Sequence, residues 1–574
     1  MTTKCKALVL IGVLAAATFG AVPTVLAQTI LVTEANPVSA AQGTLNLNVT
    51  ISGKNFKAGA VVSFYKTGTT DTGGVIVHQT TYKRSAQLIA TIDVPDTATP
   101  GSYDIVVRQG GSQEGTGPHL FRVDTKPIDA CSLELPTTTS DGTSGSPGWR
   151  DASFGGGIVL GPKFMAVGAA AIQRLPGFED KTVVVGSTRD TCAGGSSLWT
   201  IVRYRADGTL DSSFGDNGVA TKTFDRGYGL LWSVAIDASG RIVVGGYRSL
   251  SSSANYGVVA RYTANGQLDT TFAPDGLEPG IRSLSLQRYM TEARAIAIQP
   301  DGKIVIVGTD GGAMAIFRLT NTGAWDTGFN SGAVKPQLRG RYVDVGASGW
   351  AYAVALQGSG DQQRILVAGR RSVERAGNTA DADGAVWRFT MGGLPDSSFG
   401  QSGVVTTGHA YAWDVFNALA LDQWDRIVVT GSRNMGPDVS DPVSAVLARY
   451  EFNGGVDPEF NGGNPIVVYQ EGWTDHSGNA LAIDSAGRLL VGGSAVKHDA
   501  GGVSVDRGAA LWRFTPNGER DTTFGSNGWI VDPLLVNAES ASWTGLALQA
   551  DGKVVAAGTA RWVAPYPVLI RYWQ

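Results

Sequence analysis

The sequence predicts an all-β protein with two structured parts, a β-sandwich of about 100 residues followed by a seven-bladed β-propeller closed by an N-terminal outer strand. Two observations lead to this fold class. The 574 residues include 77 glycines and only 17% of them are charged, which is typical of strands joined by tight turns. In addition, one four-residue motif recurs seven times in the last three-quarters of the chain.

The first residues have the pattern of an export signal. Lys4 and Lys6 precede an apolar run at residues 7–22, and Ala27 ends a small-residue cleavage motif. A membrane anchor is the alternative interpretation, but no apolar span of about 20 residues follows. We therefore predict a signal peptide at residues 1–27 and a secreted mature chain, which is periplasmic, extracellular or on the cell surface and has no membrane span.

Cleavage leaves two cysteines, Cys131 and Cys192. In an oxidising compartment, such a pair is a disulfide candidate. The bond would tie the segment before the repeats to a loop of the first repeat. Two unpaired thiols are the alternative.

The charge and the scarce histidines limit the partners. A formal net charge of −4 provides no basic field, which argues against binding to nucleic acid. Five scattered histidines and one cysteine pair offer no transition-metal motif, so neither a metal site nor a cofactor is expected. We expect a monomer.

Residues 28–125 consist of short segments in which apolar and polar residues alternate, as expected for a sandwich of short strands. Turn and strand motifs follow in a fixed order, at Asn36-Pro37, Gly43-Thr44, Ile51 to Phe56, Gly59-Ala60 and Pro100 to Tyr103. This order resembles that of IPT/TIG domains, and the resemblance implies an immunoglobulin-like β-sandwich used as a spacer or docking unit. Residues 126–148 are polar and of low complexity, which indicates a linker.

The repeat occupies residues 149–574. An Asp-x-x-Phe tetrad recurs at intervals of 57 to 70 residues, beginning at Asp151, Asp211, Asp269, Asp326, Asp396, Asp457 and Asp521. Before six of these tetrads, an arginine stands eight residues ahead of the aspartate, at Arg203, Arg261, Arg318, Arg388, Arg449 and Arg513. Because loop lengths vary elsewhere, this constant spacing predicts one rigid turn in which Asp and Arg pair.

The pattern predicts four strands in each repeat. In the third repeat they are residues 295–298, 303–307, 313–318 and a strand after the next tetrad. The first strand carries a small alanine suited to a crowded inner position near an axis, and the Phe of the tetrad is sized to pack between sheets. The second strand ends in a glycine, at Gly186, Gly245, Gly308, Gly369, Gly431, Gly492 and Gly558.

The two ends of the repeat region complement one another. The chain ends at Arg571 to Gln574 without a following tetrad, whereas the first tetrad at Asp151 has no preceding repeat. We predict that residues 155–160 supply the outer strand of the last sheet and close the ring. A solenoid is the competing architecture, but neither end offers a capping repeat.

The recurring Asp-[Ser/Thr]-x-Phe-Gly, Asp-Gly-Lys-Ile-Val and Arg-Tyr-x-x-x-Gly pieces resemble the delta-60 repeat, a bacterial β-propeller-like family of extracellular or surface proteins. The resemblance implies a propeller and no defined enzymatic activity. Gly328, Pro458-Glu459 and Asp425 depart from the repeat pattern.

Aromatic residues gather just before the first strand of several repeats, where the loops vary most and function tends to lie. They are Trp232, Trp350, Trp413, Trp473 and Trp543, joined by Tyr228, Tyr289 and Tyr411. Carboxylates and histidines stand beside them, at Asp225, Glu292, Asp414, Asp475, Glu539, His409 and His476. Aromatic faces beside polar groups suit the stacking of sugars. The alternative is that the tryptophans only pack between sheets.

These residues favour a secreted binding or surface-interaction protein whose partner is an extracellular glycan or a surface protein. A secreted glycosidase or lyase using paired carboxylates is the rival hypothesis. A structural component of the cell envelope is the third. No Gly-x-Ser-x-Gly, His-Glu-x-x-His or phosphate-binding loop is present, so the catalytic residues of any enzyme stay unassigned.

Overall fold

The computed structural model describes residues 29–42, 44–95, 97–110, 113–124, 146–162, 165–189, 197–223, 228–251, 254–284, 291–333, 339–344, 348–373, 382–408, 413–434, 443–468, 472–473, 475–498, 504–532, 538–561 and 565–574. The chain divides into two compact units, one up to Ser132 and one from Leu133 onward. The predicted signal peptide and most of the predicted linker lie outside the described residues, so their boundaries stay predictions.

The first unit contains two four-stranded sheets, with strand orders β1-β3-β6-β5 and β2-β8-β7-β4. Its strands are β1 (Leu31–Asn36), β2 (Ser39–Ala41), β3 (Thr44–Lys54), β4 (Val61–Lys66), β5 (Ile76–Arg84), β6 (Gln87–Val94), β7 (Gly101–Gln109) and β8 (Gln113–Asp124). Along β6 every second residue is buried, which is the pattern of a strand with one face on a core. Side chains from both sheets, such as Ile51 and Phe64, form that core.

The second unit contains seven four-stranded sheets, numbered here in chain order. Sheets 1 to 3 are β10 (Met165–Gln173), β11 (Lys181–Arg189), β12 (Ser197–Tyr204), β13 (Val219–Lys222); β14 (Tyr228–Ile236), β15 (Ile242–Ser251), β16 (Ala254–Tyr262), β17 (Ile281–Ser283); and β18 (Thr291–Ile298), β19 (Ile304–Asp310), β20 (Ala313–Leu319), β21 (Arg341–Val343). Sheets 4 and 5 are β22 (Gly349–Gln357), β23 (Arg364–Ser372), β24 (Ala382–Thr390), β25 (Val404–Thr407); and β26 (Asp414–Leu421), β27 (Ile427–Asn434), β28 (Val443–Tyr450), β29 (Ile466–Val468). Sheets 6 and 7 are β30 (Asp475–Ile483), β31 (Leu489–His498), β32 (Ser504–Phe514), β33 (Trp529–Val531); and β34 (Ser540–Leu548), β35 (Val554–Arg561), β36 (Pro565–Tyr572), β9 (Val159–Leu160).

Helical structure in the described residues is confined to short 3-10 turns at Gly155–Gly157, Gly360–Gln362 and Asn461–Gly463. The predicted all-β class is therefore confirmed. No helix in the described part of the chain is long and apolar enough to cross a membrane.

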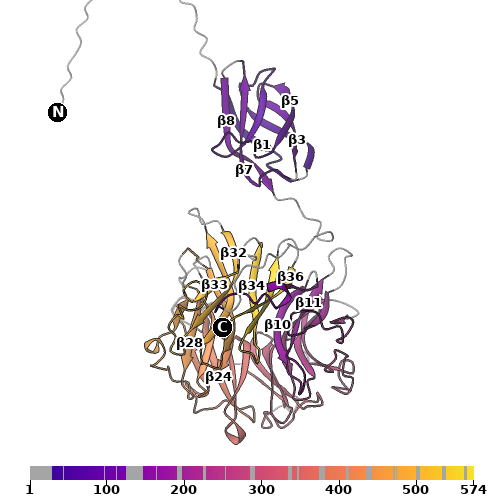
Figure 1. The fold of residues 1–574 in the computed structure, drawn as a ribbon, viewed down its shortest axis with the longest axis vertical. Helices are drawn as coiled ribbons and strands as arrows, with labels where there is room; N and C mark the ends of the chain where they lie inside the picture. The colour runs from indigo at the N-terminus through magenta and orange to yellow at the C-terminus, as the bar shows by residue number, and fades with distance from the viewer. Residues whose placement is uncertain are drawn as a thin grey trace, which may run out of the picture. The chain divides into compact units, whose positions relative to one another are not determined.

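The seven sheets form a ring. The first strand of each sheet contacts the first strand of the next, and β34 of sheet 7 contacts β10 of sheet 1. The yellow strands β34 and β36 accordingly lie beside the purple strands β10 and β11 (Figure 1). Apolar cores fill the spaces between neighbouring sheets, for example where Val185 and Ile201 of sheet 1 meet Val244 and Val258 of sheet 2. The second unit thus has a β-propeller-like fold, called the ring below.

The ring closes with a strand from its N-terminal end. Val159 and Leu160 of β9 pair with Leu569 and Val568 of β36, which confirms the pairing predicted from the unmatched first tetrad. The strand is shorter than the predicted residues 155–160, because Gly155–Gly157 form a 3-10 turn. The Asp151 amide also donates to the carbonyl of Arg571 at 2.7 Å. The outer edge of the last sheet is therefore covered by residues more than 400 positions earlier in the chain, which removes an open strand edge.

In every ring sheet, the repeated arginine, the tetrad aspartate and the tetrad phenylalanine contact one another, and we call this group the Arg–Asp–Phe clip. The arginine Nε lies 2.6 to 2.9 Å from Oδ2 of the tetrad aspartate, and the guanidinium carbon lies 4.6 to 4.9 Å from the centre of the tetrad phenylalanine. Within the described residues, six of these arginines also donate to a backbone carbonyl of the next sheet. The predicted Asp–Arg pairing is confirmed, and the constant spacing exists because the clip joins sheet to sheet.

The clip aspartates make the ring sensitive to acid. Burial alone would raise the pKa of Asp151, but hydrogen bonds from Lys553 and Ser153 and the charge of Arg571 lower it to about 2. The pKa values of the clip aspartates Asp211, Asp269, Asp396 and Asp521 are lowered in the same way, by hydrogen bonds and arginine charges that outweigh burial.

We therefore expect the free energy of unfolding of the ring to be nearly constant above about pH 5 and to fall as the pH drops from about 4 to about 2. The sign follows because a lowered carboxyl pKa stabilises the fold above the unfolded value and ceases to do so once the folded carboxylate is protonated. Urea denaturation at stepped pH measures this profile. A loss that begins near pH 6 would instead assign the acid sensitivity to histidine.

Every inner strand of the ring carries a β-bulge at the same register position. Opposite each bulge stands a glycine whose added Cβ would lie 1.7 to 2.0 Å from a backbone carbonyl oxygen of the inner strand. These glycines are Gly186, Gly246, Gly308, Gly369, Gly431, Gly493 and Gly558. In sheets 2 and 6 they directly follow Gly245 and Gly492, the glycines that the sequence pattern singled out. The bulge therefore explains why the second strand of each repeat needs glycine.

Candidate functional site

The seven bulges place one extra residue each at the same depth on the inner wall of the ring. These bulge residues are Gly168, Trp232, Arg294, Tyr352, Asn417, Asn479 and Thr544. Each is half-buried, although the residue before it in the strand is buried. Because bulges re-aim side chains at sheet edges, we treat this set, named here the bulge belt, as the candidate functional site.

One half of the bulge belt is aromatic and cationic. The guanidinium carbon of Arg294 lies 4.2 Å from the ring centre of Trp232 in sheet 2 and 5.7 Å from that of Tyr352 in sheet 4. Arg294 Nε donates a 2.6 Å hydrogen bond to the carboxylate of Glu292, which holds Arg294 in place. Tyr247 supports the indole of Trp232 from the next strand, with ring centres 6.4 Å apart. This half therefore presents fixed aromatic rings.

The other half of the bulge belt is rich in amides and hydroxyls. Asn417 donates to the carbonyl of Gly478 at 3.0 Å, and Asn479 donates to Oγ of Ser542 at 2.8 Å. Thr544 donates to the carbonyl of Val167 at 3.3 Å, which links sheet 7 to sheet 1. The side chains are thus positioned by neighbours around the ring. Their amide oxygens and hydroxyls provide hydrogen-bonding groups opposite the aromatic half.

Trp350 and Trp413, both predicted from sequence, meet around one arginine. The guanidinium carbon of Arg370 lies 4.1 Å from the ring centre of Trp350 and 5.0 Å from that of Trp413. Trp350 stands at the start of β22 and Trp413 directly precedes β26, so both lie at the edge of the ring where the inner strands begin, named here the entry rim. Trp413 is 47% exposed.

Three predicted ligand-binding residues lie elsewhere than expected. Trp543 and His476 are each only 1% exposed, so the prediction that they contact a ligand at the rim is wrong. Trp543 packs in the core between sheets 6 and 7, and His476 packs edge-on against Trp512 at 6.0 Å. Trp473 is part-buried against Trp529, with ring centres 6.2 Å apart. For these three side chains, packing between sheets is the better interpretation.

The predicted carboxylates are already engaged. Asp414 is buried and lies 3.1 Å from Nε of Arg433. Asp475 accepts a 2.9 Å hydrogen bond from the amide of Val443. Glu539 pairs with Arg561 at 3.2 Å.

Glu292 pairs with Arg294 of the bulge belt, so all four of these carboxylates have partners. Tyr411, Tyr289, His409, Asp225, Cys131 and Cys192 lie outside the described residues, so the predictions on them stay predictions. Tyr228 is 45% exposed and contacts Tyr247 edge-on at 6.3 Å. Within the described ranges, no three His, Cys, Asp or Glu side chains are grouped as metal ligands.

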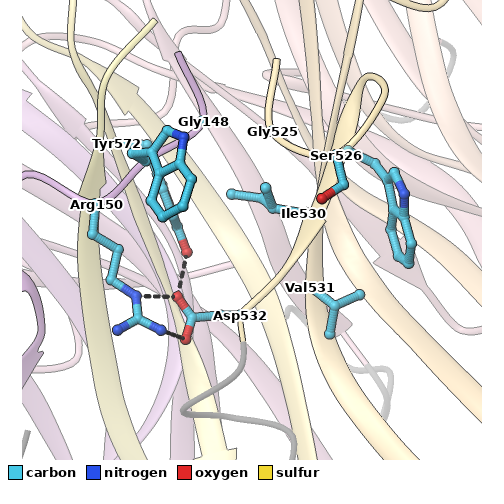
Figure 2. A pocket seen from close by; sticks show the side chains of 10 residues that line it. Gly148, Arg150, Gly525, Ser526, Ile530, Val531, Asp532 and Tyr572 are labelled. Carbon is cyan, nitrogen blue, oxygen red and sulfur yellow. Dashed lines mark hydrogen bonds and ion pairs between the residues drawn. The ribbon is translucent and has the colours of Figure 1, made fainter. Parts of the chain in front are cut away.

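A cavity of about 360 Å3 lies on the outside of the ring, between β33 and β36 (Figure 2). Arg150 and Tyr572 point toward Asp532, which accepts hydrogen bonds of 2.8 and 2.5 Å from Arg150 and of 2.9 Å from the Tyr572 hydroxyl. Arg150 belongs to the N-terminal segment, Asp532 to sheet 6 and Tyr572 to sheet 7. Because these polar groups satisfy one another, we interpret the cluster as a closure device and not as a ligand site.

The bulge residues Arg294, Tyr352, Asn417 and Asn479, and the rim residue Arg370, were not predicted from sequence. A signal for the bulge residues was present, since each stands three positions before the repeated alanine of its inner strand. Arg370 directly follows the repeated glycine of its second strand. Residues that differ between repeats at a fixed repeat position would have identified the bulge belt.

Comparisons with known proteins agree with the fold. The model of a β-propeller domain of unknown function, DUF5122, matches residues 180–214, 238–272, 299–329 and 487–524, and each match ends at a tetrad phenylalanine. No curated protein matches the chain significantly.

Several solved structures resemble the chain at low sequence identity. A protein of unknown function from Dyadobacter fermentans is 11% identical over 73% of this chain and 98% of its own, with a TM-score of 0.36. An α-L-arabinofuranosidase of Fusarium graminearum is 7% identical over 59% and 91%, with a TM-score of 0.34. A β-fructofuranosidase of Bombyx mori is 10% identical over 74% and 92%, with a TM-score of 0.26. At these scores the likenesses assign no activity. The repeat matches and the ring of four-stranded sheets identify the chain as a β-propeller protein.

Proposed function

We propose that the chain is a secreted or cell-surface glycan-binding protein. In this proposal the seven sheets are the blades of a delta-60-type propeller, and the bulge belt with the entry rim forms the recognition face. The first unit, as an immunoglobulin-like IPT/TIG domain, serves as a spacer. The observation that carries the proposal is the bulge belt, in which aromatic rings face amides and hydroxyls around one inner wall.

This composition suits sugars for a physical reason. A pyranose ring has apolar C–H faces and a polar edge of hydroxyls, so it binds best between an aromatic face and groups that donate and accept hydrogen bonds. Trp232 and Tyr352 supply the faces, and Asn417 and Asn479 supply the amides. The rings are held by Arg294 and Tyr247, which reduces the entropy lost on binding.

Binding is favoured over hydrolysis by the state of the acidic residues. A glycosidase needs two carboxyl groups facing each other across the scissile bond, one of them able to give a proton. Glu292, Asp414, Asp475 and Glu539 each already have a cation or a backbone amide as partner. The engaged state of these four carboxylates therefore favours a lectin-like role for the rim.

Trp232→Ala is expected to weaken glycan binding by about tenfold or more, since aromatic residues at the centre of a binding surface dominate its affinity. The mature protein would first be screened on a polysaccharide array, and the affinity of each hit measured by calorimetry. Trp424→Ala is the matched control, because Trp424 is 60% exposed but stands between β26 and β27, at the edge opposite the entry rim.

Thermal melting of both variants checks that the fold is intact. If the natural chain and Trp232→Ala bind the glycan with equal affinity, the bulge belt is not the binding site. Failure of every glycan to bind would contradict the proposal and favour a structural role. Release of sugar that is abolished by Asp475→Ala would replace binding with the enzymatic alternative.

A further inference from the structure

Arg370 contacts two aromatic rings, as the clip arginine Arg388 does, but Arg388 also pairs with Asp396, whereas no described carboxylate pairs with Arg370. Its guanidinium lies between the rings of Trp350, opposite it on β22, and Trp413, which precedes the first strand of the next sheet. Trp413 is 47% exposed, so one side of the cluster faces solvent. We refer to these three residues as the Arg370 cluster.

The Nε–H donor of Arg370 is unused. Its Nε is buried, and within the part of the chain that the structure describes no oxygen accepts a hydrogen bond from it. Three other arginines that stack on aromatic rings each have a carboxylate at 2.6 or 2.7 Å from Nε, namely Arg108, Arg294 and Arg426. Arg341 also lacks an acceptor at Nε, but it is 3% exposed and out of reach of a ligand.

A guanidinium with an unused Nε–H donor beside an exposed tryptophan has a specific binding preference. The aromatic rings contact the faces of the guanidinium, so its N–H donors, which lie in its plane, need acceptors at its edge. Two oxygens of one anion fit this edge in a bidentate arrangement. The carboxylate nearest in sequence to Trp413, that of Asp414, is buried and ion-paired with Arg433, so it does not neutralise the cluster.

We infer that the Arg370 cluster binds the anionic group of an acidic glycan, a sugar carboxylate or a sulfate ester, while Trp413 stacks on the ring of the same sugar. This inference rests on the proposed function and specifies its ligand class. Both anions present two or more oxygens in the spacing that the guanidinium fork matches. The cluster then selects charged over neutral polysaccharides at the entry rim.

The test compares Arg370→Gln with Arg371→Gln in the mature protein. Arg371 is the next residue of β23, points to the opposite face of the sheet and lies 3.9 Å from Asp344, so its substitution removes the same charge from almost the same place. The probes are an oligogalacturonate, a sulfated dextran and neutral dextran, with affinities measured by calorimetry. Thermal melting checks that both variants are folded.

Arg370→Gln is expected to weaken binding of the uronate or the sulfated probe by about tenfold. Arg371→Gln is expected to bind the same probe with unchanged affinity. A loss for the uronate alone assigns a carboxylate, and a loss for the sulfated probe alone assigns a sulfate ester. Equal losses in both variants would reduce the effect to net charge and overturn the inference. Binding of all probes regardless of charge would overturn it while leaving the proposed function intact, whereas binding of no glycan at all would overturn the proposed function itself.

Discussion

Asp151→Ala is expected to lower the free energy of unfolding of the ring by about 3–5 kcal/mol, the usual cost of leaving one partner of a buried ion pair alone. Arg571 is 5% exposed, and its Nε lies 2.8 Å from Oδ2 of Asp151. Lys553 lies 2.8 Å from the same oxygen but also 3.3 Å from Oδ2 of Asp551, so the substitution leaves Arg571 as the cation without a carboxylate partner. It also removes the clip that fastens the beginning of the ring to its end.

Urea denaturation measures the loss, and two controls separate its causes. Asp361→Ala alters an exposed carboxylate and is expected to change the free energy of unfolding by less than about 0.5 kcal/mol. Asp457→Ala breaks the clip with Arg449 in a sheet formed by continuous chain, so it should cost a similar amount.

Limited trypsin digestion then distinguishes the closing clip from the others. Arg150 is 9% exposed in the closed ring, and cleavage after it should become fast in Asp151→Ala and stay slow in Asp457→Ala. A natural and an Asp151→Ala chain with the same urea midpoint would contradict the role given to this clip.

Gly493→Ala is expected to destabilise the ring by about 3 kcal/mol, because an added Cβ would lie 1.7 Å from the carbonyl oxygen of Ser477, a backbone atom that cannot move aside. The adjacent Gly492→Ala is the control. Its Cβ would meet the side chains of Leu546 and Trp543 at 3.2 Å, and other repeats carry Val185 or Ala368 at this position. We expect Gly492→Ala to cost about 1 kcal/mol or less.

The difference between these neighbouring glycines measures the bulge directly. If both substitutions cost the same, the glycine would be required for packing between sheets and not for the bulge. Since the bulge also positions Asn479, Gly493→Ala at a temperature where the protein stays folded should weaken glycan binding, whereas Gly492→Ala should not.

The features of the fold that repeat were predictable. The spacing between Arg203 and Asp211 recurs in six junctions, so sequence alone identified the clip, and the unmatched tetrad at Asp151 identified the closing strand. The clip and the closing strand were predictable because the same turn geometry requires the same residue types in each repeat. The bulge was not predicted, because the glycine that accompanies it in the sequence can equally well mark the end of a strand.

The candidate site was predicted only in part. Trp232, Trp350 and Trp413 were identified as aromatics before inner strands, and the structure brings each to an arginine. Trp543 has the same sequence context, yet it is buried, because one step along a strand moves a side chain from the inner wall to the space between sheets. Arg370 was missed because a single arginine after a glycine carries no pattern, and only the folded ring brings Trp350 and Trp413 to it.

The most direct measurement of the central claim is oxidative footprinting of tryptophans with and without a bound oligosaccharide. Three exposed tryptophans report on three faces of the ring: Trp413 at the entry rim is 47% exposed, Trp424 at the opposite edge 60%, and Trp149 at the outer cavity 46%. A glycan on the bulge belt and entry rim is expected to protect Trp413 and Trp232 and to leave Trp424 and Trp149 as reactive as before. Protection of Trp149 or Trp424 with Trp413 unchanged would contradict the assignment and place the ligand on another face.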